Sequence, residues 1–110
     1  MLQSLTQEVS QLEADLCSAF SDPTRILILY ALNEQPRNVS ELVKELGANQ
    51  PTISRHLKIL RDRGLVQTAR QGTCITYALA DARLIKALDI LRAVLRDNLA
   101  SKAYLMEEKA

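Results

Sequence analysis

The sequence has 110 residues, 47% of them hydrophobic and 25% charged, and its formal net charge is +1. These values are typical of one soluble globular domain, and no apolar run reaches the roughly 18 residues that indicate a membrane-spanning helix. Because residues 1–21 do not resemble a signal peptide, and Cys17 and Cys74 lie far apart without a CxxC pair, we expect a cytoplasmic protein without a disulfide framework.

The positive charge is concentrated in the middle of the chain. Residues 1–49 carry seven acidic and three basic side chains, whereas residues 50–71 carry five basic side chains and one acidic one. DNA-binding proteins often gather their basic residues on one element. Residues 50–71 are therefore the first candidate for a contact with nucleic acid.

The N-terminal residues are predicted to form an amphipathic helix that ends near Ser21. A second helix is expected from Pro23 to about Leu32, because Asp22 can cap it and proline is tolerated in a first helical turn. The large apolar residues of the first helix recur every three or four positions and so form one stripe, which consists of Leu2, Leu5, Val9, Leu12, Leu16 and Phe20.

Two helices separated by a very short turn follow. Asn38 and Glu41 have the spacing of a capping box, and Gly47 is expected to end the helix that they begin. After Ala48 and Asn49, the pattern predicts a helix over residues 50–63. Two helices joined in this way form a helix-turn-helix. The inner face of the second helix is expected to contain Ile53, Leu57 and Leu60.

The outward face of the helix over residues 50–63 is polar, short-chained and basic. At about 100° per residue, Ser54, Arg55 and Lys58 fall opposite the apolar stripe and Thr52 falls on its flank. A helix of this kind fits the major groove of DNA. The alternative is an ordinary solvent-exposed helix face.

A hairpin and a long helix complete the chain. Residues 65–79 alternate β-branched, aromatic and polar side chains around Gly72, which predicts a two-stranded wing. Asp81 is expected to cap a last helix over residues 82–105. The predicted fold is therefore mainly α with a small β-hairpin: one winged helix-turn-helix domain over residues 1–110, with about five helices and a wing.

The terminal helices, residues 1–21 and 82–105, carry more apolar surface than one small core can bury. We expect this surface to pair with a second copy of the chain in a two-fold dimer. The interface is predicted to contain Leu5, Val9, Leu12, Leu16, Leu88, Leu91, Leu95 and Leu99.

The order of these motifs resembles the ArsR/SmtB family of bacterial and archaeal repressors. The resemblance covers roughly residues 12–99, and it is carried by the successive segments DPTRILIL (22–29), VSEL (39–42), NQPTISRHLK (49–58) and RGLV (63–66), followed by the glycine-tipped hairpin. It implies a homodimer built through the terminal helices, an inverted-repeat DNA operator, and an inducer of unknown identity that releases the DNA.

Geometry and resemblance together indicate the residues that contact DNA. Base contacts are expected from Gln50, Thr52, Ser54 and Arg55, with Lys58 nearer to phosphate. Backbone contacts are expected from Ser40 and from the wing residues Arg70, Gln71 and Thr73, although a hairpin tip can also be simply polar and mobile.

His56 is the only histidine, and it lies on the flank of the same helix. It is included among the expected DNA contacts. Two alternatives stay open, in which it packs beneath the helix or serves as a pH-sensitive group.

The sensor sites of the family have no counterpart in this sequence. Metal-sensing members carry cysteines at the start of the third helix or Asp and His pairs on the last helix, and this chain has neither, so no metal or other cofactor is expected. Dithiol sensors place a cysteine where Tyr30 stands here. Cys17 and Cys74 are the remaining candidates for an inducer that binds thiols, and the alternative is that both are small apolar side chains in partly buried places.

Two other classes of function are possible for a small domain of this kind. An enzyme is not expected, because the chain has no glycine-rich phosphate loop and no nucleophile with a base nearby. A winged helix that serves as a protein-interaction module, without sequence-specific DNA binding, is the alternative function.

Overall fold

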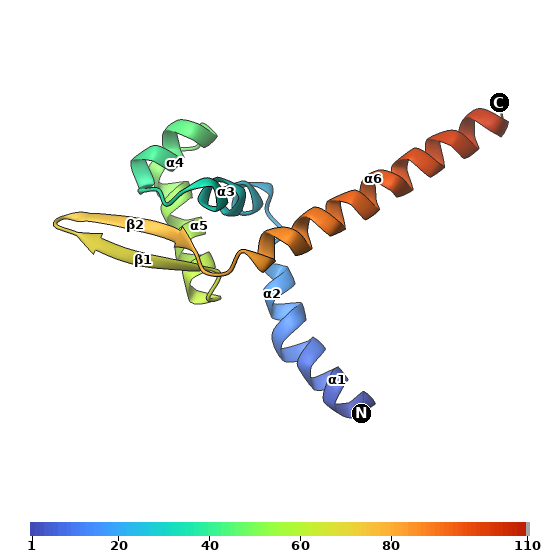
Figure 1. The fold of residues 1–110 in the computed structure, drawn as a ribbon, viewed down its shortest axis with the longest axis horizontal. Helices are drawn as coiled ribbons and strands as arrows, with labels where there is room; N and C mark the ends of the chain where they lie inside the picture. Colours follow the sequence, from blue (N-terminus) through green and yellow to red (C-terminus); the bar gives the residue numbers. More distant parts are fainter. Residues whose placement is uncertain (110) are drawn as a thin grey trace.

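The computed structural model describes the backbone of residues 1–109 and the side chains of residues 1–102, so residues 103–105 of the expected dimerisation helix lie outside the described side chains. Figure 1 shows a small body, made of α3, α4, α5 and a β-hairpin, from which α6 and the N-terminal helices project in different directions. The elements are α1 (Leu2–Glu8), the π-helix η1 (Val9–Glu13), α2 (Ala14–Ser18), α3 (Pro23–Glu34), α4 (Val39–Leu46), α5 (Gln50–Asp62), β1 (Val66–Gln71), β2 (Cys74–Leu79) and α6 (Arg83–Lys109).

The helix boundaries follow the predicted capping residues. Asp22 accepts a hydrogen bond from the backbone N–H of Thr24 at 2.8 Å, and Asn49 accepts one from that of Thr52 at 3.0 Å. Both bonds of the capping box between Asn38 and Glu41 are present. Since these contacts satisfy backbone donors that lack helical partners, they begin α3, α5 and α4 respectively. These three helices therefore begin at the predicted positions, Pro23, Val39 and Gln50.

The N-terminal segment is helical but is not the unbroken α-helix that the sequence predicted. A π-helical turn over Val9–Glu13 separates α1 from α2. A π turn bonds each residue to one five positions away, so it accommodates an additional residue and rotates the apolar stripe. Of that stripe, Leu16 and Phe20 pack against the core of the subunit, while the earlier residues stay exposed.

Helix α3 runs through the centre of the core. Its residues Ile28 and Leu29 are fully buried, which agrees with the prediction of a helix covered on several sides. The helix contacts α4, α5, β2 and α6. The core residues are Ala19, Ile28, Leu29, Leu32, Leu42, Ile53, Leu57, Leu60, Leu65, Val66, Ile85 and Leu88.

The wing is an antiparallel hairpin that is anchored at its base. Its register runs from Val66 opposite Leu79 to Gln71 opposite Cys74, and Gly72 takes the positive φ of +62° that the turn requires. The fold class inferred from the sequence, a mainly helical winged helix-turn-helix, is thereby confirmed.

Arg37 ties the wing to the helices, a role that the sequence did not reveal. Its backbone exchanges two hydrogen bonds with Tyr77 of β2, at 3.0 and 2.8 Å. Its buried guanidinium donates to the carbonyl of Ala31 and forms ion pairs with Glu34 and Glu45. The base of the wing therefore has a defined position relative to α3 and α4.

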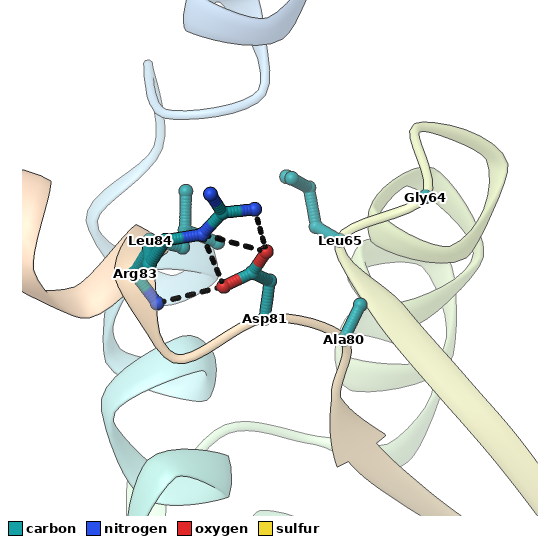
Figure 2. A pocket seen from close by; sticks show the side chains of 6 residues that line it. All are labelled: Gly64, Leu65, Ala80, Asp81, Arg83 and Leu84. Carbon is teal, nitrogen blue, oxygen red and sulfur yellow. Dashed lines mark hydrogen bonds and ion pairs between the residues drawn. The ribbon is translucent and has the colours of Figure 1, made fainter.

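Helix α6 begins beside the base of the wing. Asp81 accepts hydrogen bonds from the backbone N–H of Arg83 and from its guanidinium, which lowers the pKa of the carboxyl to about 2. Figure 2 shows this pair at the edge of a pocket that Leu65, Ala80 and Leu84 help to line. The pair satisfies the first turn of α6 and so confirms the predicted cap.

Candidate nucleic-acid interface

Helix α5 has a buried apolar face and an exposed polar face. Ile53, Leu57 and Leu60 are fully buried, and they fix the helix against α3 and α4. Among the residues expected to contact bases, Gln50, Ser54 and Arg55 are exposed and Thr52 is half-buried. The exposed side chains cluster in the first two turns, where short residues allow a close approach to a partner surface.

The positive charge on α5 is available at its surface. Neither Arg55 nor Arg61 has a side-chain partner among the described residues, and both are exposed. Lys58 lies 3.7 Å from the carboxylate of Asp62, but both side chains are more than half exposed. Such an exposed pair contributes little energy, so Lys58 can exchange Asp62 for a phosphate at small cost.

His56 does not reach the DNA-facing surface, so the direct DNA contact that the sequence predicted is wrong. Its side chain is 3% exposed and lies between α5 and the start of α3. Its Nδ1 atom is 3.5 Å from the guanidinium of Arg25, and its Nε2 atom is 3.8 Å from the carboxylate of Asp22. Burial lowers the pKa of His56. The alternative in which this residue packs beneath the helix describes the structure.

Arg25 is a structural residue that sequence reasoning missed. Its Nε atom donates to the carbonyl of Ala19 at 2.7 Å, and another nitrogen donates to the hydroxyl of Ser21 at 3.3 Å. Together with its contact to His56, these bonds hold the loop before α3 against the underside of α5.

Arg63, the last residue of the predicted DNA-reading helix, has a different role. Its Nη1 atom donates to the backbone carbonyl of Asp15 at 2.7 Å and pairs with the carboxylate of the same residue. The residue therefore attaches the N-terminal helices to the end of α5. The helix itself ends at Asp62, one residue earlier than predicted.

The residues expected to contact the DNA backbone come from two elements that share one cleft. Ser40, in the first turn of α4, and Thr73, in the hairpin turn, line a cleft of about 250 Å³. Arg70 and Gln71 are exposed near the end of β1. Arg70 pairs with Ile75, which lines the same cleft, whereas Gln71, the next residue of the strand, lines a different pocket together with Gln67 and Thr76.

The two cysteines lie on separate elements and are more exposed than expected. Cys17 of α2 and Cys74 of β2 are both free and exposed, so their interpretation as partly buried apolar side chains is wrong.

Within residues 1–102, whose side chains are described, no group of three or more His, Cys, Asp or Glu side chains is placed to hold a metal ion. No helix in the described part of the chain is long and apolar enough to cross a membrane.

The predicted dimerisation residues fall into two groups. Leu88 is 7% exposed because it packs into the core of its own subunit, and this corrects its assignment as an interface residue. Leu16 is half-buried and packs partly against the same core, so its remaining surface keeps its assignment a prediction. The other predicted residues are exposed: Leu5, Val9, Leu12, Leu91, Leu95 and Leu99. Ile90 and Val94 of α6 are exposed as well.

Comparison with known proteins supplies the family. Residues 22–68, which span α3 to the beginning of β1, match the family described as bacterial regulatory protein, arsR family. An uncharacterised helix-turn-helix transcriptional regulator of Methanocaldococcus jannaschii is 42% identical over 82 residues, which cover 71% of this chain and 92% of that protein. The transcriptional repressor SmtB of Mycobacterium tuberculosis is 41% identical over 78 residues, which cover 71% of this chain and 58% of that protein.

The fold agrees with that assignment. The homodimeric winged helix-turn-helix DNA-binding domain of a Mycobacterium bovis protein, solved in solution, superposes with a TM-score of 0.74 at 26% sequence identity, over 86% of this chain and 87% of that domain. Residues 22–68, which match the family, include the whole of α4 and α5. The chain therefore belongs to the ArsR/SmtB family and is a winged helix-turn-helix DNA-binding regulator of transcription.

Proposed function

We propose that this protein is a homodimeric repressor that binds an inverted-repeat operator with α5 of each subunit in the major groove, and that an inducer releases it from DNA. The observation that carries the proposal is the division of α5 into a fully buried apolar face and an exposed, polar, basic one. Because its apolar face stays packed against the body of the subunit, such a helix can enter the groove without any rearrangement of the core.

Sequence recognition is assigned to the first two turns of α5. Arg55 can donate two hydrogen bonds to the acceptors of one guanine, while Gln50 can pair with adenine. Thr52 and Ser54 are short enough to let the helix axis approach the base edges. Lys58 lies farther along the helix, where its flexible chain suits a phosphate.

The position of the protein along the duplex is assigned to contacts from the wing and from the cleft between α4 and the wing. Ser40 and Thr73 can donate to phosphate oxygens on the same strand because they line one cleft. Arg70, whose strand partner Ile75 lines the same cleft, extends that surface, and Gln71 would reach the DNA backbone from the other face of the wing. Contacts of this type add affinity and orientation but little sequence information.

Dimerisation is assigned to the exposed apolar side chains of α6 and the N-terminal helices. Six or more large apolar residues exposed along two projecting helices are unusual in a monomer and typical of an interface. A two-fold axis through these helices would place two copies of α5 about one turn of DNA apart. The relatives named above as a repressor and as a homodimer support the same arrangement.

The inducer would act by binding the free dimer more tightly than the DNA complex. An inducer that binds thiols at Cys17 and Cys74 is the hypothesis that the sequence leaves, although these residues lie on different elements. Replacing both with serine tests it directly. Loss of the inducer response in that variant supports the hypothesis, and an intact response rejects it.

The proposal is tested by selecting operators from random duplex DNA and titrating the selected duplex by fluorescence anisotropy. We expect an inverted repeat, one dimer per duplex, and an affinity that falls steeply as salt rises, because phosphate contacts release counterions. A scrambled duplex should bind far more weakly. Equal binding to both duplexes would instead indicate a protein-interaction module without sequence-specific recognition.

A further inference from the structure

A cluster of three polar side chains connects α3 to α6. The hydroxyl of Tyr30 donates to the carboxylate of Asp89 at 2.6 Å, and the guanidinium of Arg92 donates to the same oxygen at 3.1 Å. The guanidinium of Arg92 also lies over the Tyr30 ring, 5.1 Å from its centre, in a cation–π arrangement. Each of the three side chains therefore contacts the other two.

Apolar packing holds α6 to the body only near its first turns. The buried residues of its described part are Ile85 and Leu88, and large apolar side chains from Ile90 onward are mostly exposed. Figure 1 shows the helix leaving the body as a long rod. At the point of departure, α3 and α6 border an open groove of about 330 Å³, whose apolar lining consists of Phe20, Ile26, Leu88, Leu91 and Leu95.

The polar cluster lies at that groove, where the apolar side chains of α3 and α6 do not fill the space between the two helices. In the described part of the chain, the bond between Tyr30 and Asp89 is the side-chain hydrogen bond that joins α6 to another helix. Acceptance of this bond by Asp89 raises the pKa of Tyr30, because loss of the proton would break the bond. A directional bond to a carboxylate restricts the angle between two helices more tightly than a loose apolar contact does.

The direction of α6 affects the distance between the two DNA-binding helices of a dimer. Helix α6 carries the surface assigned to the dimer, and α3, to which it is bonded, also packs against α5. About 15 Å of helix separates Asp89 from Leu99, so a tilt of about 10° at the cluster moves Leu99 by roughly 2–3 Å and the leucines nearer the cluster by less. One base pair advances a DNA half-site by about 3.4 Å and rotates it by about 35°. The displacement at Leu99 thus approaches the axial part of the step between adjacent half-site spacings.

We propose that Tyr30, Asp89 and Arg92 set the angle at which α6 leaves the DNA-binding body and thereby determine which half-site spacing the dimer accepts. This inference rests on the proposed function. The three side chains are positioning residues, since they act through α6 and α3 and lie outside the surface assigned to DNA.

The test compares the full-length wild type with Tyr30→Phe, which removes the hydroxyl but keeps the ring under Arg92. Duplexes carry the selected operator with its central spacer unchanged, shortened by one base pair or lengthened by one. We expect wild type to prefer one spacing sharply. The variant should bind that duplex about fivefold more weakly, the size expected for one lost hydrogen bond, and should discriminate less among the three spacings.

Two readouts separate positioning from a general structural defect. The dimer fraction by sedimentation and the salt dependence of binding should equal those of wild type, because neither the exposed leucines nor a phosphate contact is changed. Asp89→Ala, which removes the acceptor oxygens, should flatten the spacing profile in the same way, and the double variant should add little, as partners in one contact do. Asp97→Ala, which removes an exposed carboxylate from the same helix, is the matched control and should retain the wild-type profile.

The outcomes are distinct. A Tyr30→Phe variant that keeps the wild-type spacing profile overturns the inference and leaves the proposed function intact. Equal weakening on all three duplexes, or a loss of dimer, also overturns it, because the cluster would then act on stability alone. A wild-type protein that selects no operator overturns the proposed function and the inference together.

Discussion

Helices α5 and α6 are both amphipathic, but only α5 finds a complete partner inside its own subunit. The inward residues Ile53, Leu57 and Leu60 of α5 have no exposed surface, whereas Leu91, Leu95 and Leu99 of α6 are each more than half exposed. Helix α5 therefore buries its inward apolar face in its own subunit and exposes polar side chains on the surface assigned to DNA. Helix α6 keeps an exposed apolar face, which is typical of a surface that binds a partner.

Substitutions in the core beneath α5 should lower the stability of the fold more than substitutions on the exposed face of α6. Leu57→Ala leaves a cavity in a site with no solvent access, so we expect it to lower the free energy of unfolding by about 2–5 kcal/mol. Urea denaturation followed by circular dichroism measures this. Leu27→Ala, which shortens a half-exposed leucine on α3, is the control and should cost far less. Equal losses in both variants would contradict the assignment of the core.

The exposed face of α6 should govern assembly. Replacing Leu91 and Leu95 together with glutamate places like charges on the surface assigned to the dimer, so we expect a monomer at micromolar concentration. Sedimentation velocity measures the change. Lys86→Glu adds a negative charge to the same helix without removing an apolar side chain and should leave the dimer intact. A stable dimer in the double variant would place the interface elsewhere.

The exposed face of α5 should govern recognition. Arg55→Ala removes a side chain able to bond two acceptors of one guanine, and we expect a loss of about 1–3 kcal/mol in operator binding together with relaxed specificity at that base pair. Anisotropy titrations on the operator and its single-base variants measure both effects. Arg61→Ala, in the last turn of the same helix, should weaken binding less and similarly on all sequences. Unchanged specificity in Arg55→Ala would place the reading surface elsewhere.

The smallest expected effect concerns the contact between α5 and α3. Because burial lowers the pKa of His56 below its ordinary value of 6.5, the unfolded chain takes up a proton at this residue more readily than the folded one. Its contribution to stability is therefore complete above pH 6.5 and declines as the pH falls through the lowered pKa. Denaturation at several pH values should show a shallower decline in His56→Gln. Identical pH profiles would mean that other groups cause the decline.

Most of the surface expected to contact DNA could be inferred from periodicity, but its flank could not. Arg55 and Ser54 lie opposite the apolar stripe and are exposed, as a step of about 100° per residue requires. His56 lies between the two faces, where the packing of α3 decides the outcome. Its neighbour Arg25 is 31 positions away in the chain, beyond the reach of any local pattern.

The sequence alone determined the elements and their order, because their signals are local. A capping side chain bonds a backbone group two or three positions away, and an apolar stripe repeats within a few turns. The cap of Asn49, the capping box of Asn38 and Glu41, and the turn at Gly72 illustrate this.

Only the tertiary structure decided which side chains join those elements. Arg63 meets Asp15 across 48 positions, and Tyr30 meets Asp89 across 59. In the same way, Leu88 and Leu91 belong to one stripe, but α3 covers the first and leaves the second exposed. Burial depends on what the rest of the chain places against a residue, and a helical repeat carries no information about that neighbour.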